Sequence, residues 1–566
     1  MQLENVIEID GVPVKVENER NLLEVISKAG IKLPVFCYHS DLSIFGACRM
    51  CMVEDEKGHL MAACSTIPKS GMKIKTNTGR LRKYRKNILE LLLASHCRDC
   101  TTCEKSGKCT LQQLAVQCGI KTVRFPNDKP ETRIDDSSAC ITIDRNKCIL
   151  CGDCVRECNE KQHVGVIDIA FRGSKAEIST AFGIPIADTN CVGCGQCAAA
   201  CPTGAIVVKD NTEELWKVLD DEETFVTCEI APAVRVGVGQ DLGLIEGENY
   251  LGRIIAALHR MGFDQVYDTS TAADITVIEE ANEFVERLKK GENLPLFTSC
   301  CPAWVKYVET KYPEFVPNIS TCKSPMGMFA SILKEYYKDK LPEGKKRHVH
   351  VALMPCTAKK GEAKREEFIK DGDQLTNIVI TTQELIRMIK RSGIMFDELE
   401  PEAIDVPFGI RSGAGIIFGV TGGVTEAVLR RLIKDDSMTT LRQIEFTGVR
   451  GLEGLKEATI PYEGRELHIA VVSGLLDARK VLKAMQKGEM KYDLIEVMAC
   501  KDGCISGGGQ PYISHRHRKL RAEGLYRSDK TTSIKRPQDN PIIDSIYDNI
   551  IKDNVHEILH VDYVKK

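Results

Sequence analysis

Three short segments in the second half of the chain place cysteines directly after an apolar run. The segment at 496–511, E-V-M-A-C-K-D-G-C-I-S-G-G-G-Q-P, has two cysteines four residues apart and then a triple glycine. The segments at 298–304, T-S-C-C-P-A-W, and at 354–362, M-P-C-T-A-K-K-G-E, supply the others. Four thiolates are the usual ligand set of a 4Fe–4S cluster. The segments together offer Cys301, Cys356, Cys500 and Cys504, with Cys300 and Lys359 left beside them.

The residues before each segment predict how these distant cysteines meet. Residues 492–498 have the composition of a buried strand, 294–297 form a short apolar run, and 348–353 alternate like a strand. In open α/β sheets, functional sites form at the carboxyl ends of strands. We therefore expect the cysteines to converge at the carboxyl ends of these strands. The spacing of Cys500 and Cys504 also suits one helical turn with both thiolates on the same side.

The region from 210 to 566 is predicted to be α/β throughout. A strand over 467–472, a helix over 476–487 and a strand over 492–498 form a β-α-β unit. Residues 515–566 are expected to form a polar tail with helical stretches, in which H-R-H-R-K is a solvated face.

Composition narrows the class of protein. A chain of 566 residues predicts several domains. Its 43% hydrophobic and 28% charged residues are typical of a soluble protein. Its net charge of −3 does not indicate nucleic-acid binding. No signal peptide is visible, and the most apolar stretch, 414–424, is too short to span a bilayer. We expect a cytoplasmic protein without a membrane or nucleic-acid partner. Disulfides are rare in the cytosol, so 25 cysteines favour metal ligation.

The N-terminal residues 1–80 carry a first cysteine set. Residues 4–16 alternate around Asp10-Gly11, a hairpin signal, and 21–29 predict a helix that stops at Gly30. Plant-type 2Fe–2S domains have the pattern Cys-x4-Cys-x2-Cys…Cys, whereas the first gap here is ten residues. A zinc site is the alternative. The candidate ligands are Cys37, Cys48, Cys51 and Cys64.

An internal repeat over 127–209 predicts two further clusters, after a polar linker at 127–138. The repeat is the two-cluster bacterial ferredoxin motif, in which the fourth cysteine of each run serves the other cluster. The first run ends in Cys158-Asn159 rather than Cys-Pro, which leaves ligation intact. One predicted cluster has the ligands Cys148, Cys151, Cys154 and Cys201. The other has Cys191, Cys194, Cys197 and Cys158.

Residues 81–126 begin with a helix predicted over 80–94 and continue as H-C-R-D-C-T-T-C-E-K-S-G-K-C. This segment predicts a small His/Cys cluster domain. On spacing alone, His96 and Cys97 compete for one ligand position.

The segments T-S-C-C-P, M-P-C-x-x-K-x-x-E and E-x-M-A-C-x-x-G-C-x-x-G-G-G-Q-P resemble the three signatures of FeFe hydrogenases. The N-terminal cysteine series is similar to that of the long clostridial type, so the resemblance covers nearly the whole chain. It implies a β-grasp plant-type ferredoxin domain, a His/Cys cluster domain, a two-cluster ferredoxin domain and a two-lobed α/β catalytic region. It also implies that His96, Cys100, Cys103 and Cys109 hold a 4Fe–4S cluster. A neutral histidine ligand should raise the potential of that cluster.

The resemblance further implies an H-cluster, a 4Fe–4S cube bridged to a diiron part with carbon monoxide, cyanide and azadithiolate. Maturation enzymes supply the diiron part, and Cys504 is the implied bridging thiolate. The implied reaction is reversible hydrogen formation with ferredoxin as electron partner. Lys359 donates a charge-assisted hydrogen bond to cyanide. The implied pocket residues are Ala231, Pro232, Met354, Phe418 and Met498.

A buried metal site needs a proton route. The resemblance implies a relay of Cys300, Glu280, Ser320 and Glu283, with Arg287 near the surface. Without the resemblance, the spacing of Glu280, Glu283 and Arg287 is also that of a solvated helix face.

Other functions stay open at this point. A sensory relative, a non-catalytic iron–sulfur scaffold and the hydrogenase subunit of an electron-bifurcating complex are the alternatives. The intact Cys300 relay and the complete cysteine signatures argue against the first two. Met326 stands where family members often have a polar residue. The five remaining cysteines, expected to be buried small hydrophobes, are Cys97, Cys118, Cys140, Cys228 and Cys322.

Overall fold

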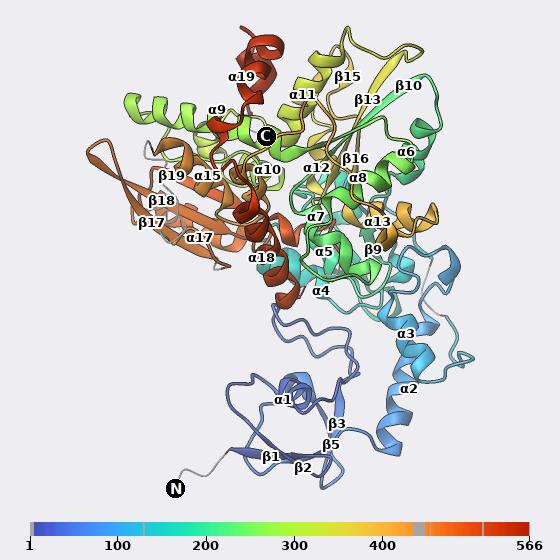
Figure 1. Ribbon diagram of the computed structural model, residues 1–566. Helices are drawn as coiled ribbons and strands as arrows, with labels where there is room; N and C mark the ends of the chain where they lie inside the picture. Colours follow the sequence, from blue (N-terminus) through green and yellow to red (C-terminus); the bar gives the residue numbers. More distant parts are fainter. Residues whose placement is uncertain (1–4, 128–130, 434–447, 453, 512–513, 565–566) are drawn as a thin grey trace.

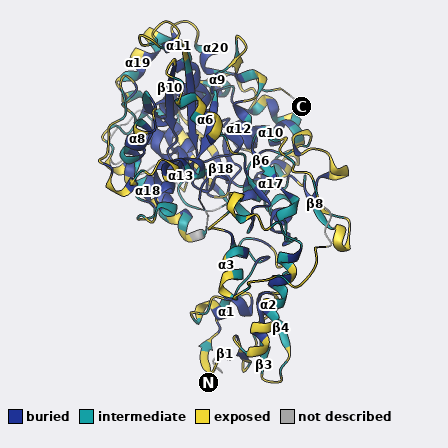
Figure 2. Cartoon of the chain, turned by 90° about the vertical axis from the view of Figure 1, so that its right-hand side faces the viewer, coloured by how far each residue is buried: buried dark blue, intermediate teal, exposed yellow. Residues whose placement is uncertain are grey.

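The computed structural model describes residues 5–127, 131–433, 448–452, 454–511 and 514–564. A narrow N-terminal part lies below a larger body in which buried residues concentrate (Figures 1 and 2). Among the described helices, none is both long enough and apolar enough to cross a membrane.

The N-terminal part is a five-stranded sheet of order β2-β1-β5-β3-β4. Its first two strands form the predicted hairpin around Asp10-Gly11. Helix α1 (Leu22–Lys28) begins where the side chain of Asn21 accepts a hydrogen bond from the Glu24 N–H, and Gly30 follows it at φ 81°. The strands are β1 (Val6–Ile9), β2 (Val12–Lys15), β3 (Met52–Asp55), β4 (Leu60–Ala62) and β5 (Lys73–Lys75).

Helices α2 (Gly79–Ala94) and α3 (Thr110–Gln117) lie between this sheet and the main body (Figure 1). The Thr78 side chain caps α2 by accepting from the Leu81 N–H, so the helix begins within one residue of its predicted start.

The internal repeat folds as two matching halves. Strands β6 (Ile141–Ile143) and β9 (Ile206–Val208) pair antiparallel. Helices α4 (Asp153–Arg156) and α5 (Gln196–Ala200) each follow a left-handed glycine, Gly152 in the first half and Gly195 in the second. Of the predicted linker, residues 128–130 lie outside the described residues, and 131–138 contain one isolated bridge, from Asp135 to Ile143.

The catalytic region contains two four-stranded sheets. One, of order β11-β10-β13-β16, is wholly parallel, and every residue of β10 is buried. The other has the order β12-β19-β18-β17, and β18, α17 (Leu475–Gln486) and β19 form the predicted β-α-β unit. The strands are β10 (Thr224–Ile230), β11 (Gln265–Asp268), β12 (Leu296–Phe297), β13 (Arg347–Met354), β16 (Ile378–Thr381), β17 (Leu455–Tyr462), β18 (Arg465–Ser473) and β19 (Leu494–Met498).

Helix α9 (Thr269–Lys290) packs against helices from both halves of the catalytic region: α11 (Pro325–Tyr337), α14 (Gly413–Ile416) and α15 (Gly423–Leu432). Its first thirteen residues are buried, and it ends at Gly291, which has φ 70°. The helix therefore extends from the core to the surface, and Glu280 lies at its buried part.

The C-terminal residues form the predicted helical stretches, α18 (His515–Thr531), α19 (Ile542–Ile546) and α20 (Val555–Leu559), but the last two pack into an apolar cluster instead of forming a polar tail. Helix α18 buries Arg518 and Arg521, so the prediction that H-R-H-R-K is a solvated face is wrong for Arg518. Arg518 pairs with Asp41 of the N-terminal part and with Asp502 beside the cysteine pair. Ion pairs between residues this far apart in the chain cannot be predicted from the local charge pattern.

Candidate functional site

The three cysteine segments meet where three strands end. Cys301 follows β12, Cys356 follows β13, and Cys500 and Cys504 follow β19. Burial raises the pKa of Cys500 far above its usual range, and neighbouring Cys356, Cys301 and Cys504 add to it. Burial, followed by the charge of Cys301, raises the pKa of Cys504 to about 12. Buried thiols this close repel one another once ionised, and iron cations relieve that repulsion, so the donor set fits a 4Fe–4S cube.

The cysteine pair at 500–504 is carried by a loop, so the predicted helical turn is wrong. Asp502 has φ 69° and Gly503 has φ 92°, which ends helical geometry between the two thiols. A Cβ at Gly503 would lie 2.6 Å from the Thr421 nitrogen, so glycine is required by space as well as by conformation. The backbone of this loop is packed against the 420–421 segment.

The glycine run brings the ferredoxin-like part next to the four-thiol site. A Cβ at Gly508 would lie 2.6 Å from the backbone oxygen of Cys194. Gln196 donates to Cys500 Sγ at 3.1 Å and to the Ser506 carbonyl at 2.8 Å. The Thr357 hydroxyl donates to the Gly193 carbonyl at 2.6 Å. The two candidate cluster sites are therefore in direct contact through backbone.

The ferredoxin-like cysteines fall into two groups that exchange their fourth members. Burial raises the pKa of Cys154 well above its usual range, and the charges of Cys201 and Cys148 add to it. Burial raises the pKa of Cys197 in the same way, with contributions from Cys194, Cys191 and Cys158. Cys201 thus lies with the first run and Cys158 with the second.

The N-terminal cysteines lie in two pairs. A hydrogen bond with the Cys37 thiol lowers the pKa of Cys48 to about 6, and one with Cys64 lowers the pKa of Cys51 to about 7. The charges of Cys37 and Cys48 also act on Cys64, so the pairs adjoin.

The His/Cys domain places its candidate ligands after α2. Burial raises the pKa of Cys109, and the charges of Cys103 and Cys100 add to it, so these three lie together. His96 is half-buried, and Cys97 Sγ lies 3.4 Å from an Asp99 carboxylate oxygen. The half-buried state of Cys97 and Cys118 departs from the expected burial, whereas Cys140, Cys228 and Cys322 are buried.

Lys359 is a buried cation beside the four-thiol site. Burial alone lowers the pKa of its ammonium, but the Glu362 carboxylate, 2.6 Å away, outweighs this and leaves the pKa raised. The neighbouring cysteines Cys356 and Cys300 also favour the charged ammonium. Lys359 is therefore charged at neutral pH and suited to an anionic ligand.

The predicted pocket residues are all buried. Phe418 and Met498 share one apolar cluster with Cys300, Cys301 and Cys504. The other predicted pocket residues are Met354, Ala231 and Pro232, of which Met354 and Ala231 lie in the adjacent core. Met326 lies in that core too.

Members of the predicted proton relay lie near one another, and three of them, Glu280, Glu283 and Arg287, are carried by α9. Burial raises the pKa of the Cys300 thiol well above its usual range, with Glu280 the next cause. Burial and then Glu283 raise the pKa of Glu280 to about 8. The Ser320 hydroxyl donates to Glu283 at 2.7 Å, and Arg287 pairs with Glu283 at 2.6 Å. All five groups are thus brought together between the four-thiol site and the surface.

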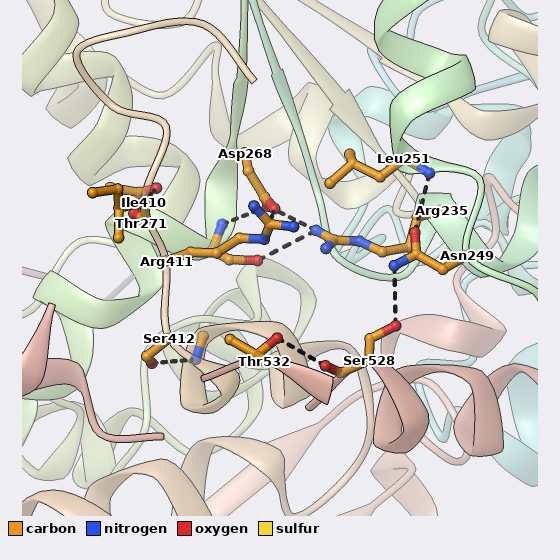
Figure 3. Close-up of polar contacts among 12 residues, drawn as sticks. Arg235, Asn249, Leu251, Asp268, Thr271, Ile410, Arg411, Ser412, Ser528 and Thr532 are labelled. Atoms are coloured by element: carbon orange, nitrogen blue, oxygen red, sulfur yellow. Dashed lines mark hydrogen bonds and ion pairs between the residues drawn. The ribbon is translucent and has the colours of Figure 1, made fainter. Parts of the chain in front are cut away.

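A buried ion network supports the pocket wall at Ala231-Pro232. Arg235 and Asp268 are fully buried and lie 2.7 Å apart, and Arg411 pairs with the other Asp268 oxygen at 2.8 Å (Figure 3). The two guanidinium groups hold the pKa of Asp268 low against the effect of burial. Sequence reasoning missed this network and Gln196, because each depends on residues distant in the chain.

Glu496 was also missed as a functional residue, although it begins the E-x-M-A-C signature. Its carboxylate accepts from the Gly422 N–H at 2.7 Å and the Thr425 N–H at 2.8 Å. It thereby fixes the start of α15 against β19, the strand that precedes Cys500. The signal available in the sequence was an acidic residue within a predicted buried strand.

Cysteine groups that lead to a buried four-thiol site, with an acid–base path from that site to the surface, define an iron–sulfur redox enzyme. Residues 224–508 match the family model "Iron only hydrogenase large subunit, C-terminal domain". The chain belongs to the FeFe hydrogenase family, whose members carry iron–sulfur clusters and an H-cluster.

Other parts of the chain match further models. Residues 6–79 match a 2Fe–2S binding domain and 147–229 a 4Fe–4S dicluster domain. Residues 85–124 match the "NADH-ubiquinone oxidoreductase-G iron-sulfur binding region", and 515–566 match "Iron hydrogenase small subunit".

Two curated relatives span the chain. It is 41% identical to "NADP-reducing hydrogenase subunit HndD" of Solidesulfovibrio fructosivorans, covering 99% of each chain. It is 35% identical to "Iron hydrogenase 1" of Clostridium pasteurianum, covering 98% of this chain and 99% of that one. A solved structure of HydA1 from Chlamydomonas reinhardtii matches with a TM-score of 0.54 and 35% identity, covering 63% of this chain and 99% of that chain.

Proposed function

We propose that this protein interconverts molecular hydrogen with protons and electrons at an H-cluster held by four thiolates. The observation that carries the proposal is their meeting beside a buried acid–base path. The proposed ligands are Cys301, Cys356, Cys500 and Cys504, the last shared with the diiron part. When bound, the H-cluster supplies the metal chemistry of hydrogen formation and cleavage.

The protein supplies charge and proton movement. Lys359 stays cationic and donates to an anionic ligand of the cluster. The Cys300 thiol stays protonated at neutral pH, and the Glu280 pKa of about 8 suits a group that gives and takes protons near neutrality. Protons then pass Ser320 and Glu283, and the pocket residues exclude water.

The cysteine groups are proposed to hold one 2Fe–2S and three accessory 4Fe–4S clusters, with His96 as the one histidine ligand. Electrons enter through the N-terminal clusters and pass the ferredoxin-like pair, whose contact with Cys500 through Gln196 supports this direction. The proposed setting is the cytoplasm, with maturation enzymes as partners for the diiron part.

Ferredoxin is the proposed electron partner. A second candidate is a subunit of a nucleotide-reducing or electron-bifurcating complex, favoured by 41% identity to an NADP-reducing hydrogenase subunit over 99% of the chain. A purified chain that turns over with ferredoxin alone supports the first, and one that needs additional subunits supports the second.

Infrared spectroscopy on protein matured with the diiron part tests the proposed function. We expect bands of metal-bound carbon monoxide and cyanide, together with hydrogen evolution from reduced methyl viologen. A fully iron-loaded, matured protein that shows neither would contradict the proposal.

Loss of a cluster on the electron-input path should reduce turnover with ferredoxin and leave turnover with methyl viologen intact. In Cys100→Ala/Cys103→Ala, we expect ferredoxin-linked turnover to fall at least about tenfold, equivalent to about 1.4 kcal/mol. Methyl viologen should still reduce the catalytic region directly. Cys118→Ala is the matched control, because it removes a half-buried thiol of the same domain outside the proposed ligand sets. Unchanged ferredoxin-linked turnover in the double variant would exclude this domain from the electron path.

A further inference from the structure

A cavity of about 470 Å³ opens where the proposed proton relay reaches the surface. It lies between α9 and the C-terminal helix α20 (Val555–Leu559). Glu283, Thr321 and His560 are among the residues that line it. Arg287 lines it as well, so the cavity is the solvent side of the relay.

Three side chains of different chemistry converge where Glu283 and His560 line this cavity. One ligand atom from each of Glu283, Cys322 and His560 lies within 4.8 Å of the other two. Cys322 Sγ is 3.8 Å from Glu283 Oε2. Backbone pairing fixes the positions, because Cys322 and His560 form an antiparallel bridge and the Val561 N–H donates to the Thr321 carbonyl at 2.7 Å.

The surroundings of His560 resemble those of a metal-binding histidine. Its Nε2 lies 3.2 Å from Glu279, whose other carboxylate oxygen accepts from the Tyr547 hydroxyl. Its Nδ1 then accepts from the Thr321 hydroxyl at 2.9 Å, and an ion bound there would replace this hydrogen bond. A carboxylate behind the second ring nitrogen orients the ring and strengthens the ligand.

We propose that Glu283, Cys322 and His560 bind a Zn²⁺ ion, with water from the cavity as fourth ligand. One sulfur, one nitrogen and one oxygen are the donor types that Zn²⁺ takes in tetrahedral sites. Bond lengths of about 2.0–2.3 Å place tetrahedral ligand atoms about 3.3–3.8 Å apart. The Cys322–Glu283 separation already has this value, and the remaining pairs would have to close by about 1.5 Å at most.

The positive charge of Arg287 repels a bound zinc ion, but the guanidinium does not lie where the ion would bind. The guanidinium pairs with Oε1 of Glu283, whereas Cys322 lies near Oε2. Zinc binding would release the proton of the Cys322 thiol to water. Glu283, the resulting Cys322 thiolate and Glu279 then carry three negative charges against one positive charge from Arg287. The site thus stays net anionic, with an affinity reduced by the cation.

A zinc ion bound to Glu283 Oε2 would occupy the oxygen that accepts the hydrogen bond from the Ser320 hydroxyl. Glu283 would then no longer pass protons between Ser320 and the surface. This inhibitory consequence rests on the proposed function, whereas binding itself rests on the geometry of the three ligands.

The test uses the full chain with its iron–sulfur clusters loaded and Zn²⁺ alone as the probe. Wild type should retain one zinc per chain after dialysis, and X-ray absorption at the zinc edge should show one sulfur at about 2.3 Å. Cys322→Ala and His560→Gln should lose this zinc, and Glu279→Gln should weaken binding about 10–100-fold. Cys228→Ala, which removes a buried thiol in β10, is the control and should bind like wild type.

Turnover is measured in parallel with methyl viologen. Zinc should inhibit wild type at least about tenfold, while Cys322→Ala and His560→Gln resist it. Wild type that binds no more zinc than Cys322→Ala would overturn the site and leave the hydrogenase function untouched. Bound zinc with a sulfur ligand but full turnover would overturn the inhibition and remove Glu283 from the proton path. If Cys322→Ala fails to load its clusters, His560→Gln decides the comparison.

Discussion

Cys300→Ser should lose about 10²–10⁴-fold in hydrogen turnover while keeping its clusters. The thiol is the group between the four-thiol site and Glu280, and the charge of Glu280 already acts on it. A serine hydroxyl is a much weaker acid, so proton transfer to and from the site becomes slow. The measurement is hydrogen evolution from reduced methyl viologen, with the infrared bands of the matured cofactor as the check on loading.

Glu280→Gln extends this test along the same path. It should reduce turnover comparably, and the double variant Cys300→Ser/Glu280→Gln should be little worse than either single one, because groups that act in one route are not additive. Cys228→Ala should keep full turnover. Wild-type activity in a fully loaded Cys300→Ser variant would remove the thiol from the mechanism.

Asp268→Asn should destabilise the catalytic region by about 3–5 kcal/mol. The substitution leaves Arg235 fully buried without its counter-charge. Because Arg235 lies three residues after Pro232 of the pocket wall, loss of the pair should also loosen that wall. Thermal unfolding of cluster-loaded protein, followed with infrared band widths, measures both effects.

The partners of Asp268 offer a graded control. The Arg411 side chain is 25% exposed, so Arg411→Met should cost much less than Asp268→Asn. The double variant Arg235→Met/Asp268→Leu removes both buried charges and should recover most of the stability. An Asp268→Asn variant as stable as wild type would mean that water or a neighbouring group solvates Arg235.

Local sequence patterns predicted the elements well. The hairpin at Asp10-Gly11, the capped start of α1 and the β18–α17–β19 unit depend on residues close together in the chain. The family signatures likewise lie within short segments, so the cysteine sets were visible without coordinates.

Features that depend on tertiary contacts were missed. The 500–504 loop is not helical, because Asp502 and Gly503 adopt positive φ where the backbone packs on residues 420–421. Arg518 is buried only because Asp41 and Asp502 meet it from distant parts of the chain. Gln196 gains its role from Cys500, 304 positions away.

The absence of a side chain at Gly508 affects the rate of electron transfer between the ferredoxin-like part and the four-thiol site. Electron tunnelling weakens steeply with the thickness of matter it crosses, and here no side chain separates the loop of Cys500 from that of Cys194. Even a methyl group at this position would wedge the two redox modules apart. Electron transfer between the two modules would then slow although every iron ligand remained in place.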